Sequence, residues 1–203
     1  MKSQNNEAQI VADYFKGFKG TVLDIGANDG QTFSNSYDLI QSGWSAVLIE
    51  PGTVFTQLQE LHKDNKAVTC YQLAIADKEQ ILTFYESGAH VKNGKDTGLV
   101  STLNPDETTR WRNSGVEFIE RKVQSVPFSW VYKWHKTFDF ITIDAESKDW
   151  EILKQIDLDA VGCRCLCIEW NGHQDLKQLY SNYIGHHGLK LISENRENLI
   201  FAK

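Results

Sequence analysis

The sequence predicts an α/β fold built on a seven-stranded, mostly parallel sheet with helices on both faces. Apolar runs of strand length alternate with segments of helical periodicity along most of the 203 residues. Such alternation is typical of parallel strands joined by right-handed helical crossovers. The last two apolar runs, near 187–193 and 197–202, are joined by a short polar turn. They are therefore expected to form a hairpin, with one C-terminal strand antiparallel to the rest.

The elements follow one another in a regular order. After a helix over 7–16, the expected strands are 21–26, 46–50, 68–75, 138–143, 162–169, 187–193 and 197–202. The expected helices are 32–42, 53–64, 127–135, 148–155 and 174–184. The first of these is indicated by Phe33, Tyr37 and Ile40, whose spacings of four and three match one helix face. The alternation lapses in a polar, glycine-containing insert around 86–126, expected on the substrate side of a single domain spanning 1–203. Two short strands are expected at ILTFY, 81–85, and EFIERKVQSVPF, 117–128.

A glycine turn follows the first strand, where the chain reads TVLDIGANDG over 21–30. Gly26 is expected to let the backbone approach a ligand closely. The three-glycine pattern that cradles a pyrophosphate is missing, and Asp24 and Asp29 suit a ligand with a cationic amino acid end. S-adenosylmethionine fits that description. Glu50, 24 positions after Gly26 and at the end of the second strand, is placed to accept hydrogen bonds from ribose hydroxyls.

Other polar residues follow the expected strands, and ligands of open α/β sheets bind beyond these carboxyl ends. They are Asn28, Ala76, Asp77, Asp144, Glu146, Glu169 and Asn171. Asp144 and Glu169 form the expected catalytic pair, with Glu146 beside them. A carboxylate here could attract a sulfonium charge and, with a neighbouring acid, take a proton from an acceptor hydroxyl.

Two alternatives concern the same region. Asp144, Glu169 and Asn171 offer oxygen ligands of the kind that Mg²⁺ prefers, but no metal is the favoured interpretation. His90 in the insert and His173 after Asn171 could reach an acceptor as general bases. Either histidine could equally be an ordinary surface residue.

Five segments together resemble the FkbM-type methyltransferases, a branch of the class I S-adenosylmethionine-dependent enzymes with a Rossmann-like fold. They read DIGANDG at 24–30, GWSAVLIEP at 43–51, LAIADKEQILTFY at 73–85, FDFITIDAES at 138–147 and NLIFAK at 198–203. The resemblance implies methyl transfer, commonly to a hydroxyl oxygen of a small molecule or sugar. One departure lies after the fourth strand, where the family usually has a glycine between two acids and this chain has Ser147 and Lys148 between Glu146 and Asp149.

The resemblance also implies roles for individual residues. Asp24 and Gly26 are expected at the methionine end of the cofactor and Glu50 at its ribose. Asp77, or the backbone beside Ala76, is expected at the adenine amino group. Ser101 lies in a serine-rich turn that the family carries near the cofactor.

Composition narrows the class of partner. A net charge of −6 and a pI near 5.5 argue against nucleic acid, which binds clustered Lys and Arg. The four cysteines indicate no disulfide framework, and no apolar run is long enough for a membrane span, so a cytoplasmic protein with a small-molecule or carbohydrate acceptor is expected. Methylation of a nitrogen or a ribose stays open as an alternative. So does a catalytically inactive, cofactor-binding regulatory or scaffold protein.

Overall fold

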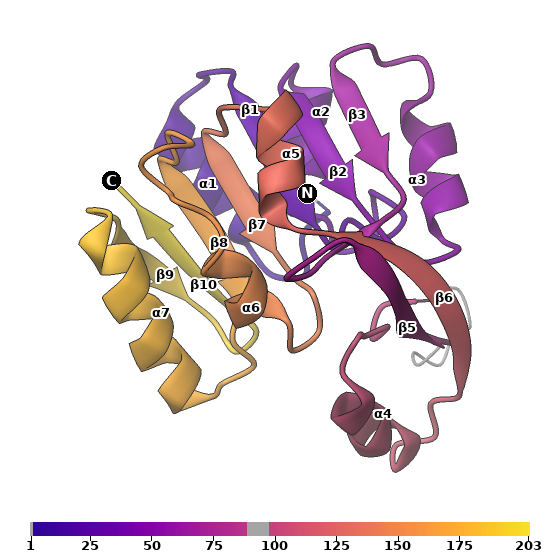
Figure 1. Cartoon of the computed structure of the whole chain (residues 1–203). Helices are drawn as coiled ribbons and strands as arrows, with labels where there is room; N and C mark the ends of the chain where they lie inside the picture. Colours follow the sequence, from indigo (N-terminus) through magenta and orange to yellow (C-terminus); the bar gives the residue numbers. More distant parts are fainter. Residues whose placement is uncertain (1, 89–97) are drawn as a thin grey trace.

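The computed structural model describes residues 2–88 and 98–203, and a seven-stranded sheet lies at its centre (Figure 1). The strands lie in the order β3-β2-β1-β7-β8-β10-β9. Their bounds are β1 Thr21–Ile25, β2 Ser45–Ile49, β3 Val68–Tyr71, β7 Phe140–Ile143, β8 Cys165–Glu169, β9 Lys190–Glu194 and β10 Asn198–Ala202. β10 is antiparallel to both of its neighbours, whereas the pairs among β3, β2, β1, β7 and β8 are parallel. The predicted sheet, mostly parallel with an antiparallel C-terminal strand, is confirmed.

Helices cover both faces of this sheet. One apolar cluster joins it to α1 Glu7–Phe15, α2 Tyr37–Gln41 and α3 Phe55–His62. The other joins it to α5 Phe128–Trp134, α6 Asp149–Leu153 and α7 Gln174–His186. Successive strand residues point to opposite faces, so Val22 belongs to the first cluster and Leu23 to the second. A strand covered on both sides must be apolar throughout, which is why the runs were recognisable in the sequence.

A second, three-stranded sheet contains the two short strands expected at ILTFY, 81–85, and EFIERKVQSVPF, 117–128, and adds to them part of the expected strand 68–75. The expected strand 68–75 is two strands, because β4 Ala74–Ile75 leaves β3 and pairs with β6 Phe118–Val126. β6 also forms a long antiparallel pair with β5 Gln80–Ser87, and Figure 1 shows this pair extending away from the central sheet. The insert between them contains α4 Pro105–Arg112, which was not predicted. Its start has the sequence of a helix N-terminus, with the Asn104 side chain accepting a hydrogen bond from the Asp106 amide at 3.2 Å.

The expected helix 32–42 is also shorter, since only α2 is helical there. The Asp29 carboxylate accepts hydrogen bonds from the amides of Gln31 and Thr32 at 2.8 and 2.6 Å. These local bonds form a turn in place of a helix, and Phe33 has a positive φ of 54°. Among the described residues, no helix is both long and apolar enough to cross a lipid bilayer.

Candidate functional site

An acidic cavity of about 400 Å³ opens at the carboxyl ends of the central strands. We define it by the six carboxylate side chains in its wall, which are Asp24, Glu50, Asp144, Glu146, Glu169 and Glu197. The insert and β5 supply less polar wall residues, among them Phe84, Val100, Leu103 and Trp111. Three basic side chains, Arg110, Lys148 and Arg196, also line the cavity. Its size is within the range of small-molecule sites, and its charge favours a ligand rich in donors or positive charge.

The strand register explains why three of these acids lie in one row. Leu48, Asp24, Thr142 and Cys167 are paired side by side across β2, β1, β7 and β8. Two residues further along the same strands come Glu50, Gly26, Asp144 and Glu169. Side chains two positions apart point to the same face of a sheet, so these residues form a row above a buried layer. Acids whose sequence positions are far apart are thereby brought to one edge.

Gly26 is required by packing within the protein. Its φ is +91°, and a Cβ built there would lie 1.7 Å from the carbonyl oxygen of Asp144. The amides of Gly26 and Ala27 both donate to the carbonyl of Ile49 at 3.0 Å. A side chain at this position would collide with the backbone after β7, so the glycine is needed for packing, and its expected role in close approach of a ligand stays a prediction. Gly26 still lines the cavity.

Glu50 is the most firmly placed acid of the row. Only 6% of it is exposed, and its two carboxylate oxygens accept the amides of Asn28 at 3.0 Å and Gly52 at 2.6 Å. Burial, with a smaller contribution from the Asp24 and Glu86 carboxylates, raises the pKa of Glu50 to about 7, although the two hydrogen bonds lower it. A carboxylate has about four acceptor positions, so two are left for ligand hydroxyls.

Asp24 is hydrogen-bonded by Ser36, which lies in the part of the expected helix 32–42 that is not helical in the structure. Asp24 is 5% exposed, and its carboxylate accepts the Ser36 hydroxyl at 2.5 Å. Burial raises the pKa of Asp24 to about 7, with the Asp144 charge adding to the effect. Next to Ser36, the Asn35 amide group donates to the Thr142 hydroxyl at 3.2 Å, and both residues line the cavity. The signal for this missed turn was the Ser-Asn-Ser run at 34–36, typical of a loop.

Three acids gather at the ends of β7 and β8. Oxygens of Asp144, Glu146 and Glu169 are all within 4.8 Å of one another. Desolvation in the cavity raises the pKa of all three carboxyls, and to about 6 for Asp144, where the Glu7 charge adds to the effect although Asp144 as a whole is exposed. The Asp144 charge also raises the pKa of Glu146 and of Glu169. Such oxygens are also the donors that a hard cation takes. Asn171, considered with Asp144 and Glu169 from the sequence, also lines the cavity, and its side chain forms a hydrogen bond with Glu169 that lowers the pKa of that carboxyl.

Other predicted site residues lie elsewhere. Ala76 and Asp77 line a second cavity of about 310 Å³ beside Lys154 and Gln155, while Ala74 and Ile75 line the acidic one. The pairing of β4 with β6 continues through the Ala76 amide, which donates to the carbonyl of Val126 at 2.9 Å. Ala76 and Asp77 therefore do not line the acidic cavity, and their expected contact with adenine stays a prediction.

The remaining candidates, Ser101, His173 and His90, were expected near an acceptor. Ser101 lines the acidic cavity, whereas His173 precedes α7 and lines neither of the two cavities described here. His90 lies outside the described residues.

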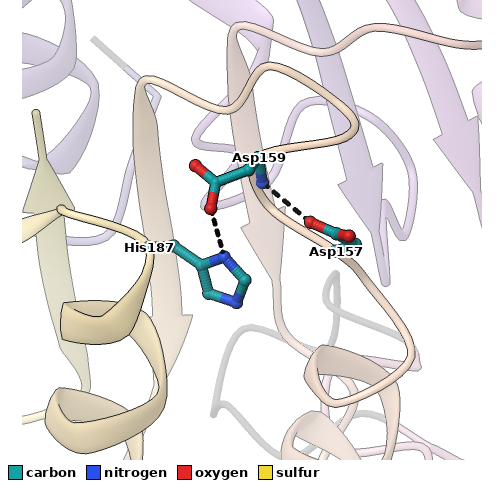
Figure 2. A group of neighbouring side chains, drawn as sticks. All are labelled: Asp157, Asp159 and His187. Atoms are coloured by element: carbon teal, nitrogen blue, oxygen red, sulfur yellow. Dashed lines mark hydrogen bonds and ion pairs between the residues drawn. The ribbon is translucent and has the colours of Figure 1, made fainter.

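A separate exposed group contains Asp157, Asp159 and His187 (Figure 2). The Asp159 carboxylate contacts His187 Nδ1 at 2.8 Å, and it accepts a hydrogen bond from Lys203 Nζ at 3.4 Å. Asp157 accepts the amides of Asp159 and Ala160 at 3.1 and 3.0 Å. These contacts join the turn after α6 to the ends of α7 and β10, which accounts for the group as a structural link.

Comparison with known proteins identifies a family. The family described as "Methyltransferase FkbM domain" matches residues 24–195. No curated protein sequence matches the chain.

Solved structures share the fold at low sequence identity. PH1948 from Pyrococcus horikoshii, provisionally assigned as an RNA methyltransferase, is 11% identical, with a TM-score of 0.52 over 98% of this chain and 83% of that one. Precorrin-6y C5,15-methyltransferase from Geobacter metallireducens is 11% identical, with a TM-score of 0.49 over 97% and 86%. The N-terminal domain of human METTL16 in complex with SAH is 13% identical, with a TM-score of 0.49 over 97% and 68%. The first of these likenesses supports a Rossmann-like methyltransferase fold.

Proposed function

The chain belongs to the FkbM methyltransferase family, and from that membership we propose that it transfers the methyl group of S-adenosylmethionine to a hydroxyl oxygen of a carbohydrate or another small metabolite. The observation that carries the proposal is the row of acids across the strand ends, with Glu50 on one side of Gly26 and Asp144 and Glu169 on the other. The row offers acceptors for ribose hydroxyls at one end and a proton-accepting pair at the other.

The donor set fits this cofactor. S-adenosylmethionine carries positive charge on its sulfonium and amino groups and hydroxyl donors on its ribose. Glu50 has two free acceptor positions beyond its bonds to Asn28 and Gly52, which suits the ribose. Asp24, buried beside the glycine turn, suits the cationic amino acid end. Ala74 and Ile75 supply an apolar wall for the base.

When bound, with Glu50 at its ribose and Asp24 at its amino acid end, S-adenosylmethionine would supply an electrophilic methyl group to the acceptor oxygen, and S-adenosylhomocysteine would be the leaving group. The chain contributes alignment and a place for the proton. Asp144 and Glu169 take the proton released by the acceptor hydroxyl, and their raised pKa values make them stronger bases than ordinary carboxylates. Protonation also relieves the repulsion between these neighbouring charges.

The charge of the cavity supports a neutral or cationic acceptor over a phosphorylated one. Six carboxylates face three basic side chains in the wall, and the whole chain carries a net charge of −6. Phosphate groups would be repelled there, whereas sugar hydroxyls donate hydrogen bonds that free carboxylates accept.

Calorimetric titration with S-adenosylhomocysteine, followed by an acceptor panel, tests the proposal. Micromolar binding without any NAD signal is expected. The panel holds sugars, small alcohols, amines and a short RNA, and S-adenosylhomocysteine formation is the readout. We expect turnover with hydroxyl acceptors to fall at least about 100-fold in Asp144→Asn. Asp175→Asn, an exposed aspartate on α7, is the matched control and should leave turnover unchanged.

Three results would contradict the proposal in different ways. Failure of folded protein to bind S-adenosylhomocysteine would remove the cofactor assignment. Binding with no turnover on any acceptor would favour a regulatory or scaffold role. Turnover confined to amines or RNA would keep methyl transfer but replace the hydroxyl acceptor.

A further inference from the structure

The loop between β7 and α6 is held in an unusual conformation. Glu146 and Ser147 follow one another with φ values of 46° and 75°. Residues other than glycine rarely adopt positive φ, and they persist there only when surrounding contacts impose it. The same loop places Glu146 against Asp144 and Glu169 in the acidic cavity. Contacts that impose this conformation therefore determine where the third carboxylate lies.

One such contact comes from the insert. The Thr102 hydroxyl donates a hydrogen bond of 2.7 Å to the carbonyl oxygen of Glu146, 44 positions later in the chain. Thr102 is 1% exposed, so water does not compete for this bond. Among the described residues, no other side-chain hydrogen bond joins the insert to residues 144–148.

Thr102 is itself fixed in place. Its backbone pairs with Tyr85 of β5 through two hydrogen bonds of 2.9 and 3.0 Å. The adjacent Ser101 hydroxyl accepts the amide of Ser87 at 3.0 Å, which secures the same segment to β5 a second time. The hydroxyl of Thr102 is therefore presented from a segment that is bridged to β5 rather than from a free loop.

We propose that Thr102 is a positioning residue, which clamps the loop after β7 so that the Glu146 carboxylate faces Asp144 and Glu169. This assignment of a role within the catalytic site rests on the proposed function. The insert then contributes to the acceptor side in two ways. Its own residues line the acidic cavity, and the Thr102 hydroxyl holds the loop that carries Glu146. Thr102 acts through Glu146 and does not line the acidic cavity.

Amide hydrogen exchange measured residue by residue tests the clamp without an acceptor. Thr102→Val keeps the shape of the side chain and removes the donor, and amide exchange over 145–148 should become about fivefold faster. Thr102→Ser restores the hydroxyl and should restore slow exchange. Thr108→Val is the matched control, because the Thr108 hydroxyl is also buried and donates at 2.7 Å, but to Pro105 within α4.

Two outcomes would overturn the proposal. One is unchanged exchange over 145–148 in folded Thr102→Val. The other is faster exchange confined to α4, because the Thr102 hydroxyl also accepts the Asn104 amide at 2.8 Å and a purely structural role would act there.

The wild-type protein provides a check that needs no variant. A bonded, buried Thr102 hydroxyl proton should exchange slowly enough to be seen by NMR, and rapid exchange would overturn the proposal. Titration with S-adenosylhomocysteine alongside separates the two proposals. If the wild-type protein does not bind S-adenosylhomocysteine, the proposed function is contradicted. The exchange rates, in contrast, report only on the hydrogen bond between Thr102 and Glu146.

Discussion

Replacing Glu50 with glutamine should weaken S-adenosylhomocysteine binding by about 30-fold. The side chain keeps its size but loses its charge and one of its two acceptor oxygens. In the structure each oxygen already accepts a backbone amide, one from Asn28 and one from Gly52. In glutamine one of the two oxygens is replaced by an NH₂ group, which donates and cannot accept. That NH₂ group would face a backbone N–H and a ribose hydroxyl, which are both donors.

The magnitude follows from the bonds affected. A hydrogen bond to a charged group contributes about 1.5–3 kcal/mol, and the substitution removes roughly one such bond to the ligand. A loss of about 2 kcal/mol corresponds to about 30-fold in Kd. Part of the loss also comes from the loop at Asn28, which Glu50 positions beside the ligand.

Calorimetric titration at pH 8, where Glu50 is ionised, measures the change directly. Glu86→Gln is the matched control, since Glu86 also accepts an amide of the loop after β2, that of Thr53, but does not line the acidic cavity. Its Kd should stay within about twofold of wild type. A Glu50→Gln protein that is folded and binds as tightly as wild type would refute the reasoning. An equal loss in Glu86→Gln would show that loop packing, and not ligand contact, sets affinity.

Three further predictions concern pH and backbone strain. Burial raises the pKa of Asp24 from 3.8 to about 7, so the folded protein binds more protons than the unfolded chain between these values, and its free energy of unfolding falls as pH rises through them. Asp24→Asn should flatten that fall in urea titrations from pH 4 to 8, and an unchanged slope would contradict it. Gly26→Ala should cost about 3 kcal/mol or more in urea unfolding, because the added Cβ meets backbone, whereas Gly115→Ala, at a φ of +88° with open space around it, should cost about 1 kcal/mol. Ser147→Gly should raise the free energy of unfolding by about 0.5 kcal/mol, as relief of left-handed strain exceeds the added entropy of the unfolded chain, and a loss of stability would count against it.

Local pattern was sufficient for the order of the elements. The expected boundaries of the central strands other than β3 fall within three residues of those observed. These strands are covered on both faces, so they are continuous apolar runs that stand out between polar segments. Gly26 and Glu50 were identified for the same reason, because each ends such a run. Where the chain instead formed its own turn, as at Asp29 and Phe33, periodicity placed the start of a helix five residues before α2 begins.

The sequence by itself determined the fold class, the family and the acids that end the strands, since all of these depend on contiguous runs and local spacing. Only the tertiary structure decided which acids meet. Strand register set Glu50, Asp144 and Glu169 in one row, and pairing of β4 with β6 placed Ala76 and Asp77 at the second cavity. The contact of Thr102 with Glu146 spans 44 positions and two sheets. Such contacts are products of packing between distant segments, and no spacing in the chain encodes them.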